Sequence, residues 1–79
     1  MFVRVKLFAT LSRYALNGAS GVPFEVGLSE GETLGDLVNQ LKLPREETKV
    51  FFVNRRARSR DWNLKPGGEV GIFPPVAGG

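Results

Sequence analysis

Apolar and polar residues alternate at the start of the chain, which predicts a β-strand with one buried face. The apolar positions on that face are Val3, Val5, Leu7 and Ala9. Glycines mark turns within residues 17–21, after a short helical connection at residues 11–16, and residues 22–26 then predict a second strand. Pro23 favours an edge position for this strand, because proline has no amide hydrogen to donate. The two strands are expected to form a hairpin.

One amphipathic helix is predicted to begin after Thr33. Thr33 and Asp36 have the spacing of a capping box, with aspartate in place of the usual glutamate. Gly35 weakens the first turn by about 1 kcal/mol relative to alanine, so packing must hold this helix. Pro44 is the last position by which the helix must end. The apolar residues that fall on one stripe of the helix, and that we expect in the core, are Leu34, Leu37, Val38 and Leu41.

Two more strands are predicted in the second half of the chain. Residues 50–53 are all apolar and indicate a buried strand, with Val50 and Phe52 expected in the core together with Phe24. Residues 69–73 form the last strand, and its positions alternate between two faces. Val70 and Ile72 lie on one face, and Gly71 and Phe73 on the other.

The segment between these two strands is predicted to be mostly irregular. A turn is expected at residues 54–55, an irregular or short-strand segment at 56–62 and a tight turn at 65–68. Trp62 is more typical of a loop anchor than of a binding residue.

The order hairpin, helix, strand, loop, strand predicts the fold. A single amphipathic helix must cover one face of a mixed sheet, which gives an α+β sandwich. A last strand placed beside the first would be parallel to it and central. This arrangement is the β-grasp, or ubiquitin-like, fold. With 79 residues and no internal repeat or linker, we expect one domain over residues 1–79, with residues 74–79 as a flexible C-terminal arm.

Composition excludes several kinds of chemistry. The chain has no cysteine, so disulfides and thiolate metal sites are ruled out. It also has no histidine, which removes the usual general base near neutral pH and the commonest metal ligand. No segment approaches the length of a membrane span and the N-terminus is not typical of a signal peptide. We therefore expect a cytoplasmic protein that does not interact with membranes.

Four arginines lie close together at Arg55, Arg56, Arg58 and Arg60, and they contribute much of the net charge of +3. Such a cluster can indicate nucleic-acid binding. This one is short, has no interleaved aromatic residue and is followed by Asp61. A solvated loop is the better interpretation, an acidic patch on a partner comes second, and no nucleic-acid partner is expected.

The C-terminal arm suggests a more specific function. Pro74 and Pro75 fix φ near −65° and favour an extended backbone. Gly78 and Gly79 carry no Cβ, so the carboxylate of Gly79 could pass through a narrow gap. Four extended residues after Pro75 would reach roughly 13 Å, far enough to enter another protein's active site. The alternative is a frayed end with no function.

Residues 5–9, Val-Lys-Leu-Phe-Ala, and residues 67–79, which end in Phe-Pro-Pro-Val-Ala-Gly-Gly, resemble the MoaD/ThiS sulfur-carrier family. This family includes the small subunit of molybdopterin synthase and the thiamin-synthesis carrier. The resemblance spans the chain in element order, and the double proline is more similar to the molybdopterin branch. Two departures are Gly67-Gly68 where the family often has Gly-Asp, and a more basic segment at residues 54–60.

The resemblance implies a carrier that works through its last residue. An E1-like adenylyltransferase would use ATP and Mg²⁺ to adenylate the Gly79 carboxylate, and sulfur transfer would then give a thiocarboxylate. That sulfur would go to a pterin precursor on a larger synthase subunit, in an expected heterotetramer. The chain itself would bind no cofactor and act as a non-catalytic, sulfur-donating subunit. Gly78 would provide clearance, and the arm residues that would dock into the partners are Pro74, Pro75, Val76 and Ala77.

Phe8 and Phe73 also match family positions, namely exposed hydrophobic residues that dock partners. If their strands are central and adjacent, the two rings would form one patch on the uncovered face of the sheet. The alternative is that either ring is simply packed beneath residues 56–62.

Three other functions stay open from the sequence. The carrier could serve another pathway, such as thiamin, cysteine, tRNA thiolation or a tungsten-pterin cofactor. Gly79 could instead form isopeptide bonds with lysines, as in a ubiquitin-like modifier. The last alternative is a plain interaction domain with an inert tail.

Overall fold

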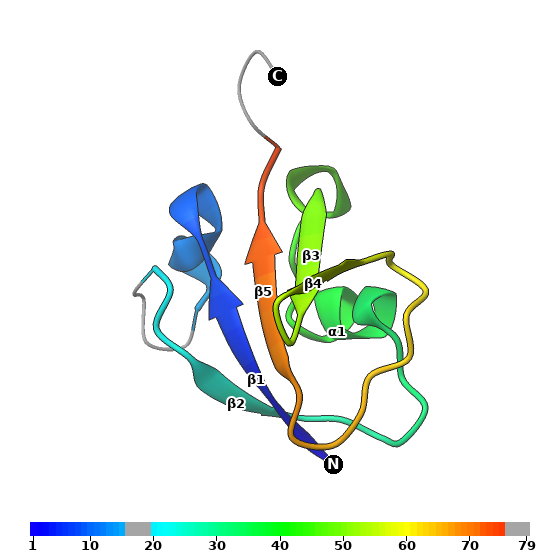
Figure 1. Cartoon of the computed structure of the whole chain (residues 1–79). Helices are drawn as coiled ribbons and strands as arrows, with labels where there is room; N and C mark the ends of the chain where they lie inside the picture. The colour runs from blue at the N-terminus through cyan, green and yellow to red at the C-terminus, as the bar shows by residue number, and fades with distance from the viewer. Residues whose placement is uncertain (16–19, 76–79) are drawn as a thin grey trace.

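The computed structural model describes residues 1–15 and 20–75 (Figure 1). Within these residues, five strands form one mixed sheet in the order β2-β1-β5-β3-β4. The strands are β1 (Phe2–Leu7), β2 (Phe24–Gly27), β3 (Val50–Val53), β4 (Arg56–Arg58) and β5 (Glu69–Phe73). The helical elements are the α-helix α1 (Leu34–Gln40) and two 3₁₀ helices, η1 (Ala9–Tyr14) and η2 (Arg45–Glu47).

The predicted topology is confirmed. β1 pairs with β2 as an antiparallel hairpin, and β2 is an edge strand. β5 lies between β1 and β3, parallel to β1 and antiparallel to β3. The register places Val5 opposite Val70 and Leu7 opposite Ile72, which brings the apolar faces of the two central strands together. The chain therefore has the α+β, ubiquitin-like β-grasp architecture.

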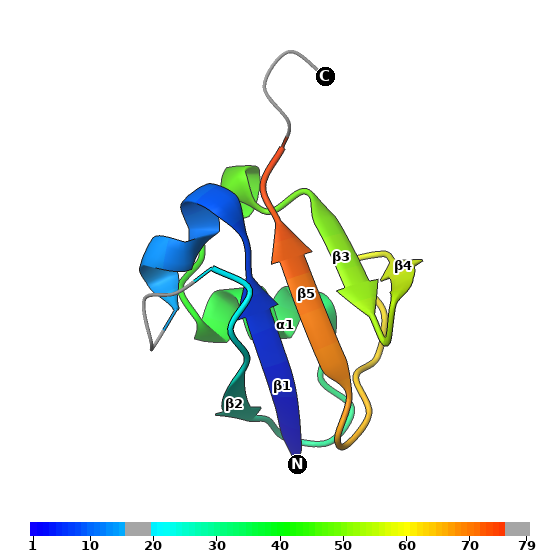
Figure 2. The same cartoon turned by 60° about the vertical axis from the view of Figure 1, so that its left-hand side comes forward.

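The helix α1 lies against one face of the sheet and leaves the other face uncovered (Figures 1 and 2). Its capping box is formed: the amide of Asp36 donates to Thr33 Oγ1 at 3.2 Å, and the amide of Thr33 donates to Asp36 Oδ2 at 2.8 Å. Leu41 is the C-cap and is partly buried. The buried side chains that α1 and the central strands contribute to the core are Val3, Val5, Leu7, Leu34, Leu37, Val38, Val70 and Ile72.

The predicted burial of β3 is wrong by one residue. Val50 and Phe52 are each 36% exposed, whereas Phe51 and Val53 are buried at 4% and 7%. Phe51 pairs with Ile72 of β5 and so faces the core. A run of four apolar residues has no alternation, so only its pairing decides which side chains point inward. Phe24 is partly buried and packs against the core, in line with the prediction.

The ends of the first two strands also differ from prediction. Ala9 does not extend the buried face of β1; it is exposed, has φ of 54° and begins η1. This element confirms the predicted helical connection as far as Tyr14, while residues 16–18 lie outside the described part of the chain. Pro23 precedes β2 and is not part of it. The predicted turn at residues 20–21 is present.

The later turns form as predicted. Asn54 and Arg55 have φ of 50° and 71° and connect β3 to β4 in a tight hairpin. The amide of Gly68 donates to the carbonyl of Lys65 at 3.2 Å, which closes the turn before β5. Trp62 is half-buried and packs against the core, so its predicted role as a loop anchor is confirmed.

Candidate functional site: an aromatic patch at the base of the C-terminal arm

Three aromatic rings meet on the uncovered face of the sheet. Phe8, which follows β1, stacks on Phe73 at the end of β5, with 4.2 Å between ring centroids and 3° between ring planes. Phe52 of β3 meets Phe73 edge-on, at 5.7 Å and 81°. We call Phe8, Phe52 and Phe73 the aromatic patch. The sequence predicted that Phe8 and Phe73 adjoin, and it missed Phe52 because it assigned this residue to the core.

Glycine backbone makes room for the stacked pair. A Cβ on Gly71 would lie 3.3 Å from Phe8 Cε2 and 3.6 Å from Phe73 Cε1. On the other side, a Cβ on Gly21 would lie 3.2 Å from Phe8 Cε1, and this residue has φ of +72°, which favours glycine. The amide of Phe8 donates to the carbonyl of Ile72 at 3.2 Å. The Phe8 ring is thus held by backbone from both β5 and the loop before β2.

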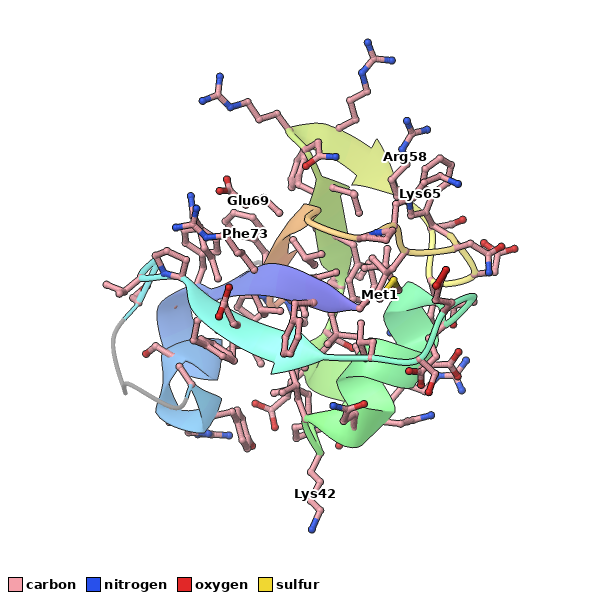
Figure 3. The ribbon with its side chains drawn as sticks, turned by 90° about the horizontal axis from the view of Figure 1, so that it is seen from below. Met1, Lys42, Arg58, Lys65, Glu69 and Phe73 are labelled. Carbon is pink, nitrogen blue, oxygen red and sulfur yellow. The ribbon has the colours of Figure 1, made fainter. Side chains whose placement is uncertain are left out.

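Charged side chains border the patch on the same face. Lys6 Nζ and Glu69 Oε1 form an ion pair at 3.1 Å. Figure 3 shows Glu69 and Phe73 on the side of the sheet away from α1. A surface hollow is lined here by Lys6, Phe8, Phe52, Arg55, Glu69, Gly71 and Phe73. No residue of the 56–62 segment lines this hollow, so the aromatic patch is not packed beneath that segment.

The C-terminal arm leaves the sheet beside the aromatic patch. Its first residue, Pro74, follows directly from the central strand β5, and the carbonyl of Phe73 accepts from the amide of Lys49 at 3.0 Å. Pro74 is half-buried and Pro75 is exposed. A second hollow at this point is apolar and is lined by Ala9, Val50, Phe52, Phe73, Pro74 and Pro75. The other predicted arm residues, Val76, Ala77, Gly78 and Gly79, lie outside the described residues.

The arginine cluster divides into two pairs. Arg55 and Arg56 are exposed, as a solvated loop requires. For the other two this interpretation is wrong: the Arg58 guanidinium lies 4.0 Å over the Trp62 ring, and Arg60 Nη2 donates to the carbonyl and hydroxyl of Thr48 at 3.0 and 2.9 Å. The sequence gives little sign of the Arg60 contact, because it joins a side chain to a partner twelve residues away.

The described residues show neither a metal site nor a membrane-spanning helix. In residues 1–15 and 20–75, no group of three or more acidic side chains is arranged to hold a metal ion, and the chain has no histidine or cysteine to supplement one. Over the same ranges, no helix has the length and apolar character needed to cross a membrane. What the site does offer is a partly exposed aromatic surface beside Pro74 and Pro75, the first two residues of the arm.

A family model described as the ThiS family matches residues 5–79. The chain belongs to the ThiS family. Among solved structures, this ThiS-family protein is similar to one from Pyrococcus furiosus described as "Putative molybdopterin converting factor, subunit 1". That match has 34% identity and a TM-score of 0.72, and it covers 96% of this chain and 99% of the other. No curated protein matches the chain.

Two structures from Haloferax volcanii are also similar. SAMP1 matches at 26% identity with a TM-score of 0.71, over 100% of both chains. Small archaeal modifier protein 1 matches at 22% identity with a TM-score of 0.73, over 95% of this chain and 98% of the other, which supports the fold alone. The predicted membership of the MoaD/ThiS family is thereby confirmed. The fold of this chain is shared by ThiS- and MoaD-like sulfur carriers and by small ubiquitin-like modifiers.

Proposed function

We propose that this protein is a sulfur carrier that acts as the small subunit of molybdopterin synthase. The observation that carries the proposal is the position of the arm in a chain of the ThiS family. The arm continues directly from the central strand β5 and begins beside a partly exposed aromatic patch. A partner that bound this patch would have the chain end within reach, since the four residues after Pro75 span roughly 13 Å when extended.

The proposed chemistry takes place on Gly79 as the C-terminal residue. A carboxylate is a poor electrophile and must first be activated. An E1-like adenylyltransferase binds ATP and Mg²⁺, and the Gly79 carboxylate attacks the α-phosphorus and displaces pyrophosphate. A sulfide equivalent then attacks the acyl carbon and displaces AMP, which leaves a thiocarboxylate. Gly78 gives clearance, because a residue without Cβ fits a narrow channel.

The aromatic patch and the start of the arm form the proposed docking surface. Exposed apolar surface of this kind marks protein interaction sites. Aromatic side chains dominate interface energies, and the stacked pair is held rigidly by the glycine backbone around it. The residues proposed to contact partners are Phe8, Phe73, Pro74, Pro75, Val76 and Ala77.

The proposed destination of the sulfur is a pterin precursor in molybdenum cofactor synthesis. The 34% identity to the Pyrococcus furiosus protein over nearly the whole of both chains supports this branch, as does the double proline before the terminal glycines. The precursor would be held by a larger catalytic subunit in a heterotetramer. The carrier, residues 1–79 as one domain with its arm, would act in the cytoplasm and bind no cofactor of its own.

The test is mass spectrometry of the untagged protein after incubation with an E1-like enzyme, ATP and a sulfide source. The expected result is an oxygen-to-sulfur exchange that fragmentation places on Gly79, and that is absent when ATP is omitted. An unmodified Gly79 with an enzyme that is active on its own carrier would contradict the proposal. Oxidation of Met1, which adds one oxygen and nearly the same mass, is distinguished from this exchange by the same fragment spectra.

A ubiquitin-like protein modifier is the second candidate, because SAMP1 matches the chain over its full length. In this function the activated Gly79 would react with a lysine amine and form an isopeptide bond. Conjugates in cell extract that survive reducing agent, and that are lost when Gly79 is deleted, would favour it. A thiocarboxylate that restores no molybdopterin synthesis would instead favour a carrier for thiamin, cysteine, thiolated tRNA or a tungsten-pterin cofactor.

A further inference from the structure

A third hollow, which the proposed function does not use, is lined mainly by cations. It opens on the opposite side of β3 from the aromatic patch, because buried Phe51 lines it and exposed Phe52 does not. Its four cations come from two segments of the chain, residues 45–49 and 58–60, and are Arg45, Lys49, Arg58 and Arg60. One carboxylate, that of Glu46, lines the same hollow. A concentration of positive charge in one concave surface is the electrostatic requirement for binding an anion.

Arg60 is fixed in place by neighbours on several sides. Its Nη2 donates to both the carbonyl and the hydroxyl of Thr48, and its guanidinium lies 5.1 Å from the centroid of the Phe51 ring. Thr48 is buried, and its hydroxyl donates to the carbonyl of Arg45 at 2.9 Å. The remaining N–H groups of the planar guanidinium are therefore held in a defined orientation, which lowers the entropy lost on binding a ligand.

The charge of Arg60 is not balanced by a carboxylate within the described residues. The described residues form two ion pairs, Lys6 with Glu69 and Arg13 with Glu47. Neither pair includes a cation of the hollow. Burial lowers the pKa of Arg60, and the positive charge of Arg45 lowers this pKa further. Two like charges held near each other disfavour each other's charged form, and an anion placed between them would offset this repulsion.

Two further acidic side chains near the hollow take part in other hydrogen bonds. Asp36 and Asp61 line an adjoining hollow together with Arg45 and Arg60. The carboxylate of Asp36 accepts from the amide of Thr33 in the capping box, and that of Asp61 accepts from the hydroxyl of Ser59. These carboxylates hold the local backbone in place and leave the arginines without an ion-pair partner among the described side chains.

Arg58 adds a second oriented guanidinium. It lies 4.0 Å over the Trp62 ring, a cation–π arrangement that restrains the side chain. Its Nε is buried and has no hydrogen-bond partner among the described residues. The stack therefore keeps this charge at the rim of the hollow, where it adds to the field of the other cations.

We infer that this hollow is a binding site for a phosphate-type oxyanion, with Arg45 and Arg60 as its main ligands and Lys49 and Arg58 as supporting charges. Guanidinium groups match the geometry of phosphate oxygens and form short, charge-assisted hydrogen bonds with them. A doubly charged phosphate balances the two main arginines, whereas one carboxylate balances a single charge. Free phosphate and the phosphate groups of a nucleotide present the same chemistry to this site, and the experiment distinguishes the two sources.

The site is tested by NMR titration of the ¹⁵N-labelled full chain with sodium phosphate, against sodium chloride at equal ionic strength. Saturable shifts are expected for the amides of residues 45–49 and 58–60 with phosphate only. Arg45→Ala should weaken this binding about tenfold, because it removes a charge-assisted hydrogen bond. Arg45 is chosen because it is exposed, so its replacement leaves the packed Arg60 in place.

The matched control is Lys42→Ala, which removes the same charge from an exposed side chain that points away from the rest of the molecule (Figure 3). It should leave phosphate binding unchanged. Equal weakening by both variants, or shifts that chloride reproduces, would overturn the inference because they reflect net charge alone. A parallel titration with ATP identifies the source of the phosphate group. If ATP binds more tightly than free phosphate, and Arg45→Ala abolishes this binding, the site is assigned to a nucleotide. Equal affinity assigns it to free phosphate.

Discussion

The stem of Arg60 occupies the space where a side chain on Gly35 would lie. A Cβ on Gly35 would be 3.2 Å from Arg60 Cγ, and the amide of Gly35 donates to the carbonyl of Arg60 at 2.8 Å. The other end of Arg60 is hydrogen-bonded to Thr48. Arg60 therefore connects the first turn of α1 to the segment before β3, and this contact favours a glycine at a helix position where glycine is otherwise unfavourable.

The close contact predicts the sign of a double-mutant cycle. Gly35→Ala alone should fail to give the gain of about 1 kcal/mol that helix propensity provides, because the new Cβ crowds the Arg60 stem. In an Arg60→Ala background, the same change should stabilise the protein by about that amount. Urea unfolding of the four proteins measures the coupling. An equal gain from Gly35→Ala in both backgrounds would show that the contact has no energetic effect.

Truncation should destabilise the protein much more at Phe51 than at the neighbouring Phe52. Phe51→Ala removes a buried side chain and should destabilise the fold by about 3–5 kcal/mol. Phe52→Ala removes a side chain that is 36% exposed and should cost about 1 kcal/mol. Chemical unfolding compares the two. A reversed order of stability would mean that β3 presents its other face to the core.

Phe52→Ala also tests the function of the aromatic patch. If the patch docks the activating enzyme, Phe52→Ala should lower the rate of adenylation while the protein remains folded. Phe2→Ala is the matched control, because Phe2 is 64% exposed but is not part of the aromatic patch. Equal rates for Phe52→Ala and wild type, measured as pyrophosphate release, would exclude Phe52 from the docking surface.

Gly71→Ala should disturb the stack of Phe8 on Phe73. The added Cβ would lie 3.3 Å from Phe8 Cε2, so the rings must separate or shift. Changed ring-current shifts of the two phenylalanines in the NMR spectrum and a loss of about 1 kcal/mol are expected. Gly27→Ala is the control, since its Cβ would meet only the exposed ring of Phe2, at 3.4 Å. Unmoved ring signals in Gly71→Ala would mean that the stack does not depend on this glycine.

The capping box should contribute measurably to stability. Thr33→Ala removes the oxygen that accepts from the amide of Asp36 and should cost about 1 kcal/mol. Thr33→Ser keeps that oxygen and should cost much less. Thermal or urea unfolding distinguishes the two, and equal losses would assign the effect to the methyl group of threonine.

Deletion of Gly79 should separate function from folding. The core side chains that the structure describes all precede Pro74, so the midpoint of thermal unfolding should be unchanged. Thiocarboxylate formation and sulfur transfer should be abolished, because the acyl group to be activated moves to a different residue. A C-terminal tag should have the same effect. A large drop in the unfolding midpoint would show that the arm is structural and count against the proposed function.

Local sequence signals were sufficient where one element determines its own structure. The capping box at Thr33, the apolar stripe of α1 and the exact bounds of β5 follow from spacing and turn residues within a few positions. The single helix then required a sheet with one covered face, which led to the β-grasp topology. The same alternation placed Phe73 on the uncovered face of β5, opposite the buried Val70 and Ile72.

Only the tertiary structure decided the remaining features, because they depend on partners distant in the sequence. The inward face of β3 was set by its pairing with β5, since four apolar residues in a row fit either face equally well. The role of Arg60 was set by Thr48 and Gly35, which lie in other segments. The sequence determined the elements and their order, because these depend on local backbone preferences and hydrophobic periodicity. The aromatic patch and the cationic hollow arise from side chains that meet only once those elements have packed.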